Sequence, residues 1–396
     1  MDDDTVALVR SKIDQAETRL DDLGIDAWLT LARETSEIAE PALSLVLGAG
    51  VVWESALLIT PDGDNHAILG RYDASPAESV GSYDVHAYDE SIRPHLRDVL
   101  AEVDPDRLAI NYAEESQVAD GLTHGMYRRL CDLLADTPYP DRFESSAPVM
   151  VHLRSSLTET ERARMARAAE LTEELLADAV AAWEPSWTEA RFADYLHGRM
   201  REAGLDSAWS WEGCPAVDAG AAAPVGHTLP GDRTLPPGEV LHVDFGVRYE
   251  GYASDIQRLY YRPVDDEEPP AALREAFTDV RAAIDAGMDA LAPGVQGYEV
   301  DAAVRETITD RGWPAFEHAA GHTVGRNAHD AGPLLGPRWE RYGDRPERTV
   351  SAGEIYTLEL GVETEWGYLG QEELVEVTDD GAAYFLPPQT SLRTIG

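Results

Sequence analysis

Pairs of carboxylates on two segments of the C-terminal half are the residues best suited to chemistry. In LHVDFGVRYEGYASDIQR, alternating strand patterns flank a loop at residues 248–251, which predicts a hairpin with Asp244 directly opposite Asp255. In EIYTLELGVETEWGYLGQEELVEV, a loop at residues 364–367 places Glu359 directly opposite Glu372. Opposed carboxylates destabilise a sheet unless a proton or a cation lies between them. The two pairs therefore predict bound cations.

The alternative is that both pairs face solvent, since 74 of the 396 residues are acidic. The flanking residues argue against it. Val243 and Phe245 alternate with Asp244, and Leu358 and Leu360 flank Glu359. Each strand therefore has an apolar face that should pack against a core, with its carboxylate on the opposite face.

A nitrogen ligand is expected from the segment AFEHAAGHTVGRNAHD, which holds three of the 11 histidines. Gly321 and Gly325 in this segment allow close approach of the backbone. Four carboxylates and one imidazole form an oxygen-rich set that suits Mn²⁺, Co²⁺ or Fe²⁺, whereas structural zinc prefers thiolates. Shared carboxylates imply two ions about 3.5–4 Å apart, as in two-metal hydrolases.

The composition is strongly acidic, with 32 basic and 74 acidic residues and a formal charge of −42. Lys12 is the single lysine in the sequence. Such an excess of like charge favours a halophilic protein, because the Debye length falls to about 3 Å at 1 M salt. An acidic interaction protein is the alternative, but the acids are spread along the whole chain. The charge argues against nucleic acid as a partner.

The sequence shows neither a targeting segment nor a membrane span. Its first residues, MDDDTVALVRSKID, lack the cationic start and apolar core of a signal peptide, and no apolar run reaches spanning length. We therefore expect a cytoplasmic protein. Cys131 and Cys214 are too few for a disulfide framework or a thiolate metal cage, so both are expected to be packed thiols. Any metal must be held by oxygen and nitrogen.

Two domains are expected, residues 1–150 and residues 151–396, in an α/β (α+β) fold. The first domain alternates helical and strand patterns and should contain a mixed sheet, with a Pro-Asp-Gly-Asp hairpin turn at residues 61–64. Prolines at 138, 140 and 148 punctuate the boundary. In the second domain, strands are expected around residues 208–262 and 316–390. Helical patterns there cover about residues 158–184, 187–203, 270–291 and 297–311.

Residues about 155 to 390 resemble the pita-bread metallopeptidases of family M24, which include methionine aminopeptidase, aminopeptidase P and prolidase. The resemblance rests on VDFG, GYASDIQR, GHTVG, LELG and QEELVEVT, in that order. It implies that the ligands of two metal ions are Asp244, Asp255, His322, Glu359 and Glu372. Asp255 and Glu372 would bridge the ions. Mn²⁺ or Co²⁺ is expected, with Fe²⁺ or Zn²⁺ as alternatives.

Further residues resemble the prolidase and aminopeptidase P branch. His227 in APVGHTLPGDR is similar to the family's substrate-side histidine, and His329 to its second catalytic histidine. His318 is similar to the additional histidine of this branch. The first 150 residues resemble the branch's creatinase-type, non-catalytic domain. The resemblance implies Xaa-Pro peptidase activity on short proline-containing peptides and a homodimer.

Three positions depart from the family pattern. Gly370 stands where prolidases and aminopeptidase P usually carry an arginine, two residues before the last ligand. The usual route to a substrate carboxylate is thereby put in question. Leu360 replaces the usual proline after the fourth ligand, and Gln257 replaces the usual threonine two residues after the second. These last two changes alter the groups that orient the ligands.

The expected activity is exopeptidase cleavage of an Xaa-Pro bond in di- or short oligopeptides. A water bridging two divalent ions is strongly acidified and would supply the attacking hydroxide. Glu359 would pass the proton to the leaving nitrogen, while His227 and His329 would stabilise the oxyanion and His318 would shape the leaving-group side. One alternative is a pita-bread hydrolase of a non-peptide amide, such as an ectoine derivative. Another is a non-catalytic pita-bread binding protein, which five intact ligands disfavour.

Overall fold

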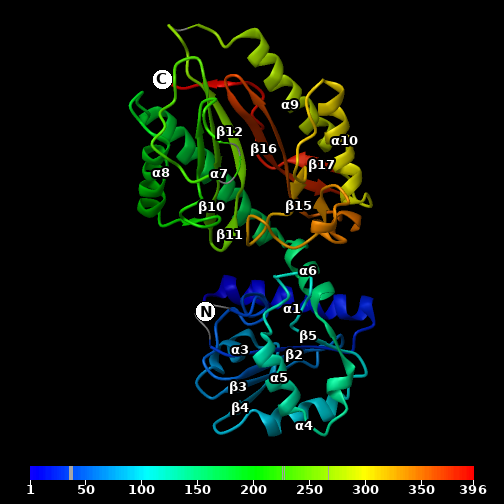
Figure 1. Ribbon diagram of the computed structural model, residues 1–396. Helices are drawn as coiled ribbons and strands as arrows, with labels where there is room; N and C mark the ends of the chain where they lie inside the picture. The colour runs from blue at the N-terminus through cyan, green and yellow to red at the C-terminus, as the bar shows by residue number, and fades with distance from the viewer. Residues whose placement is uncertain (35–38, 225, 227, 266) are drawn as a thin grey trace. The chain divides into compact units, whose positions relative to one another are not determined.

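The computed structural model describes residues 1–34, 39–224, 226, 228–265 and 267–396. The chain divides into two compact units, Met1–Arg154 and Ser155–Gly396, so the division falls close to residue 150, where the sequence placed a domain boundary. Figure 1 shows the first unit in blue to cyan and the second in green to red. Both units combine helices with sheets, which confirms the predicted mixed α/β class.

The first unit is built on a six-stranded sheet in the order β4-β3-β2-β1-β5-β6. The strands β1 and β2 pair antiparallel while β1 and β5 pair parallel, so the sheet is mixed, as predicted. Its strands are β1 (Ala27–Ala32), β2 (Ser55–Ile59), β3 (His66–Gly70), β4 (Asp84–Tyr88), β5 (Leu108–Ile110) and β6 (Phe143–Ser145). Its helices are α1 (Asp3–Leu23), α2 (Leu43–Val46), α3 (Ser75–Val80), α4 (Arg93–Val103) and α5 (His124–Leu133), with the short η1 (Tyr139–Arg142); α6 (Ala147–Ser155) follows β6.

Both faces of the sheet are buried at its central strand β1. Trp28 belongs to one hydrophobic core, together with α1 residues such as Ile13 and Leu20. Leu29, its neighbour on β1, belongs to a second core that includes Leu96 of α4. Side chains that alternate along a strand point to opposite faces, so β1 is covered on both sides.

The second unit is built on a seven-stranded sheet. Five of its strands follow the order β15-β16-β12-β9-β8, and the other two are β17, which pairs with β16, and β18, which pairs with β12. These strands are β8 (Ala216–Ala219), β9 (Val240–Phe245), β12 (Ile256–Tyr261), β15 (Ile355–Thr364), β16 (Gly367–Thr378), β17 (Gly381–Tyr384) and β18 (Arg393–Thr394). Smaller sheets contain β7 (Asp206–Ser207), β10 (Val247–Tyr249), β11 (Tyr252–Ala253), β13 (Gly321–His322) and β14 (Leu334–Leu335). The short helices η2 (Glu340–Tyr342) and η3 (Arg345–Glu347) precede β15.

Four long helices accompany this sheet, and each begins and ends within two residues of the range expected from the sequence. They are α7 (Glu159–Ala182), α8 (Glu189–Ala203), α9 (Ala271–Ala290) and α10 (Gly297–Asp310). The helix α7 starts with a capping box, in which the Thr158 side chain accepts from the Glu161 amide and the Glu161 carboxylate accepts from the Thr158 amide. These reciprocal bonds explain why the sequence signal located this helix start so closely.

The first predicted hairpin has a different register from the one expected. Tyr249 pairs with Tyr252, so the turn consists of two residues, Glu250 and Gly251, with φ of 47° and 85°. Positive φ at both central residues is typical of a tight type I′ hairpin turn. Asp244 therefore lies opposite Gln257, and its predicted direct pairing with Asp255 is wrong. Because the partner moved by two residues, both aspartates keep the same face of the sheet.

The second predicted hairpin is confirmed residue by residue. Thr364 pairs with Gly367, and Glu359 pairs directly with Glu372. Leu358 and Leu360 are buried in the hydrophobic core that includes α9 and α10, so Glu359 between them must point to the other face. Two carboxylates thus lie opposite one another on that face.

Candidate metal centre

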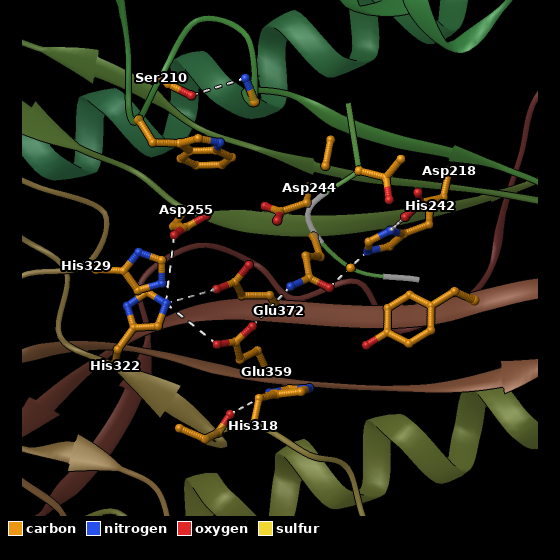
Figure 2. Close-up of a pocket in the computed structure, with 18 of the residues that line it drawn as sticks. Ser210, Asp218, His242, Asp244, Asp255, His318, His322, His329, Glu359 and Glu372 are labelled. Atoms are coloured by element: carbon orange, nitrogen blue, oxygen red, sulfur yellow. Dashed lines mark hydrogen bonds and ion pairs between the residues drawn. The ribbon is translucent and has the colours of Figure 1, made fainter. Parts of the chain in front are cut away.

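Carboxylates and one imidazole from four strands and one loop converge in the second unit (Figure 2). The Nε2 atom of His322, on β13, lies 3.6 Å from Glu359 Oε1 of β15. It also lies 3.9 Å from Asp255 Oδ2, just before β12, and 3.9 Å from Glu372 Oε1 of β16. Asp244 of β9 lines the same cavity. The structure therefore brings together all five residues that the sequence assigned as ligands.

The carboxylates in this cluster are buried close to one another, so their ionised forms are unfavourable. Burial and the nearby Asp244 and Glu359 raise the pKa of Asp255 well above its ordinary value. Burial also raises the pKa of Glu372 well above its ordinary value, with a further contribution from the charge of Asp255. For Glu359, burial raises the pKa to about 7. Buried carboxylates of this kind need a proton or a cation. Divalent cations would fulfil this need.

The donor atoms fit a metal site in spacing as well as in charge. Asp255, His322 and Glu372 each offer a ligand atom, and these atoms all lie within 4.8 Å of one another. Burial and the neighbouring His329 lower the pKa of His322 well below its ordinary value, so its imidazole is neutral at pH 7. A neutral imidazole has a lone pair for a metal ion. Carboxylate oxygens with one histidine nitrogen suit divalent metals such as Mn²⁺, Co²⁺ and Fe²⁺.

A cavity of about 680 Å³ opens onto these ligands. His318 and His329 both line it, and the rings of His322 and His329 lie with their centroids 4.1 Å apart. Burial lowers the pKa of His318, so its ring is neutral at pH 7 and Nδ1–H donates to the Ala319 carbonyl at 2.7 Å. Its Nε2 is then left as a hydrogen-bond acceptor. His227, the fourth histidine predicted for this site, lies outside the described residues.

A chain of hydrogen bonds beside the ligands was not predicted from the sequence. Asp218 of β8 pairs with His242 Nδ1 at 2.9 Å, and His242 Nε2 meets Gln257 Oε1 at 2.9 Å. Gln257 Nε2 then donates to Glu359 Oε2 at 3.2 Å. Since His242 lies between two acceptors, both of its ring nitrogens carry protons. Although burial opposes it, the hydrogen bond with Asp218 raises the pKa of His242.

The absence of a side chain at Gly370 is part of the same arrangement. A Cβ atom there would lie 2.4 Å from Gln257 Oε1, 2.6 Å from His242 Nε2 and 2.7 Å from Tyr368 Cε1. The glutamine and histidine thus occupy the space beside Cα of residue 370. The two departures noted in the sequence, Gln257 and Gly370, are therefore coupled by packing.

Arg345, from η3, is a cation on the cavity wall that sequence reasoning also missed. Its guanidinium donates to the backbone carbonyls of Gly332 and Asp330, each at 3.3 Å. Burial lowers its pKa. Its segment also contains Arg338, Arg341 and Arg348, and no periodicity distinguishes Arg345 from these arginines. By contrast, His242 had a signal, because it lies two residues before Asp244 on the same strand face.

Comparisons with known proteins identify the family. Residues 163–379 match metallopeptidase family M24. The chain belongs to this family. It is therefore a metallopeptidase, and membership implies divalent metal ions. It is 25% identical to YqhT of Bacillus subtilis, an uncharacterized peptidase, over 331 residues that cover 83% of this chain and 86% of the relative.

Solved structures share the fold. An Xaa-Pro dipeptidase from Bacillus anthracis has a TM-score of 0.77 and 21% identity, covering 98% of this chain and all of its own. An X-Pro aminopeptidase from Thermotoga maritima has a TM-score of 0.75 and 22% identity, covering 95% of this chain and all of its own. This M24 chain thus has the pita-bread fold with an N-terminal domain. In the described part of the chain, no helix is long and apolar enough to span a membrane.

Proposed function

We propose that this M24 metallopeptidase is a dinuclear exopeptidase that cleaves the Xaa-Pro bond at the N-terminus of di- or short oligopeptides. The observation that carries the proposal is one cavity in which four carboxylates and His322 adjoin His318 and His329. Solved structures of similar fold include an Xaa-Pro dipeptidase and an X-Pro aminopeptidase, which supports this substrate class.

In this proposal Asp244, Asp255, His322, Glu359 and Glu372 would hold two divalent ions, Mn²⁺ or Co²⁺. The ions, when bound, acidify water and polarise the scissile carbonyl. The buried carboxylates would be balanced by this positive charge and would therefore stay ionised at neutral pH.

The protein's own groups then position the peptide and move a proton. Glu359 accepts the proton of the attacking water on its carboxylate and delivers it to the leaving nitrogen of proline. The hydrogen bond from Gln257 Nε2 holds that carboxylate in place through Glu359 Oε2. His329, together with His227, donates to the oxyanion that develops on the scissile carbonyl. His318 shapes the wall on the leaving-group side of the cavity.

Arg345 offers a way to recognise the free carboxylate of a dipeptide. Gly370 has no side chain that could bind a carboxylate, and Gln257 and His242 fill the space beside it. Arg345 lines the cavity and donates to two backbone carbonyls among the described residues, each through a single N–H. A guanidinium has five N–H donors and matches a carboxylate in shape. We therefore assign the substrate carboxylate to Arg345.

The experiment is to measure amine release from Xaa-Pro dipeptides, Xaa-Pro-Yaa tripeptides and Met-Ala-Ser in molar KCl with added Mn²⁺ or Co²⁺. Chelator-sensitive cleavage before proline supports the proposal. Glu359→Gln should abolish it, whereas Glu363→Gln, on an exposed position of the same strand, should leave it unchanged. Binding of two metal ions without cleavage of any peptide would refute the peptidase assignment and favour a non-peptide amide such as an ectoine derivative. Binding without turnover of peptides or amides would favour a non-catalytic binding protein.

The charge of −42 supports a further proposal, that the enzyme is halophilic and resides in a salt-rich cytoplasm. Its unfolding temperature and activity should rise as KCl increases from 0.1 M to above 1 M. Loss of activity in molar KCl would contradict this.

We also propose a homodimer, on the resemblance to prolidases, which light scattering coupled to size-exclusion chromatography in molar KCl would test.

A further inference from the structure

A second group of metal-ligating side chains lies in the first unit, on neighbouring strands β3 and β4. These strands pair in parallel, with His66 opposite Asp84 and Ile68 opposite His86. Residues two apart on a strand share a face, so His66, Asp84 and His86 all project from one face of the sheet. The strand β4 stands at the end of the sheet order, where its partly exposed side chains are accessible to ions.

The ligand atoms of this group have the spacing of a metal site. The distance from His66 Nδ1 to His86 Nε2 is 3.2 Å, and that from His86 Nε2 to Asp84 Oδ2 is 3.5 Å. One atom from each residue lies within 4.8 Å of the other two. Tetrahedral zinc with bonds of about 2.0–2.1 Å separates its ligand atoms by about 3.3 Å. A single ion could therefore contact both imidazoles and the carboxylate without rearrangement of the strands.

The surroundings of His66 also favour a bound cation. Its side chain is only 4% exposed, and Nε2 has no hydrogen-bond partner among the described residues. This atom faces Asp64 Oδ1 at 3.7 Å. A histidine that binds metal through one nitrogen usually presents its other N–H to a carboxylate, which fixes the ring. A hydrogen bond between the His66 and His86 rings would account for the short distance between them. It would not give the buried Nε2 atom of His66 a partner.

We propose that His66, Asp84 and His86 bind one transition-metal ion, with Zn²⁺ as the best match, and that a water molecule completes the tetrahedron. Two imidazoles with one carboxylate favour Zn²⁺, Ni²⁺ or Cu²⁺ over Mg²⁺ and Ca²⁺, which prefer oxygen. This site is separate from the proposed catalytic pair, because all of its ligands belong to the first unit. It ties β4 to β3 and thereby stabilises the end of the sheet.

The test uses the full chain with its catalytic centre saturated by Mn²⁺. Equilibrium dialysis in molar KCl against buffered micromolar free Zn²⁺, followed by metal analysis, counts zinc per chain. Wild type should bind one more Zn²⁺ than His86→Ala, and His124→Ala, a substitution at an exposed histidine on α5, should bind as wild type. Zinc exchanged into the catalytic centre contributes equally to all three proteins and cancels in the comparison.

Thermal unfolding supplies a second readout that does not depend on activity. Zinc should raise the unfolding temperature of wild type and His124→Ala but should raise that of His86→Ala less. Asp84→Asn, which keeps the shape of the side chain but removes its charge, should weaken zinc binding at least tenfold. Equal zinc counts and equal thermal shifts in wild type and His86→Ala would overturn the proposal, whether or not the catalytic assignment is correct.

Discussion

A methyl group added at Gly370 should disrupt the hydrogen bonds that hold Glu359. In Gly370→Ala, the new Cβ would lie 2.4 Å from Gln257 Oε1 and 2.6 Å from His242 Nε2. Gln257 is the more flexible of the two, so it should rotate away. It would then lose its 2.9 Å contact with His242 and its 3.2 Å bond to Glu359. We therefore expect effects on both stability and turnover.

The size of each effect follows from the contacts that are lost. Inserting a methyl group into a packed interior costs about 1–3 kcal/mol, a range that includes the rearrangement of Gln257. A loss of about 2 kcal/mol in the second unit should lower its unfolding temperature by about 4–8 °C. Loss of a group that orients a metal ligand costs about 10–100-fold in activity, so kcat should fall by that factor.

The assay compares thermal unfolding and kcat, in molar KCl, for Gly370→Ala, Gln257→Ala and the double variant. Because the single variants disturb one network, the double variant should lose less than the sum of the two, by about 0.5–3 kcal/mol. Gly198→Ala is the matched control, since nothing lies within 4 Å of a Cβ at that position. Wild-type stability and kcat in Gly370→Ala would refute the reasoning, and simple additivity would show that Gln257 is not the displaced group.

Three further predictions concern single side chains. Burial raises the pKa of Glu40 to about 7, above its ordinary value, so its stabilising effect is complete below about pH 4.5 and is lost as pH rises through 7. Glu40 should contribute about 3 kcal/mol to the stability that denaturant unfolding shows to be lost between pH 4.5 and 9, and Glu40→Gln should reduce this loss. An unchanged loss would exclude Glu40 as a cause. Arg258→Met should lower the free energy of unfolding by about 3 kcal/mol, because buried Glu373 loses a partner at 3.0 Å. Adding Glu373→Gln to this variant should recover part of the loss. An unaltered free energy of unfolding in Arg258→Met would count against a stabilising role for this ion pair. Arg345→Met should raise KM about tenfold or more for Xaa-Pro dipeptides but little for their C-terminal amides, and an equal rise for both would show that Arg345 does not bind the carboxylate.

Local patterns in the sequence were sufficient to predict the main elements and one complete hairpin. Alternation of leucines with Glu359, and an even loop at residues 364–367, fixed the pairing with Glu372. The other hairpin was wrong by two residues because Glu250 adopts φ of 47°, which non-glycine residues rarely do. Its site residues still lie on the predicted face, since a shift of two residues preserves the side-chain alternation.

The site residues that could not be predicted depend on contacts between distant segments. Asp218 reaches His242 only because β8 pairs beside β9, with these two residues opposite one another. Arg345 reaches the cavity from η3, which has no strand periodicity. The reason for a glycine at position 370 follows from the positions of the Gln257 and His242 side chains around it. A single sequence carries no direct signal for such packing.

The most direct test of the two-metal account is a titration of chelator-stripped protein with Mn²⁺, with bound metal and Xaa-Pro cleavage measured on the same samples in molar KCl. We expect no cleavage without metal, a plateau in rate at two catalytic ions per chain, and loss of tight binding and cleavage in Glu372→Gln. Full cleavage by metal-free protein, or an unchanged titration in Glu372→Gln, would contradict it.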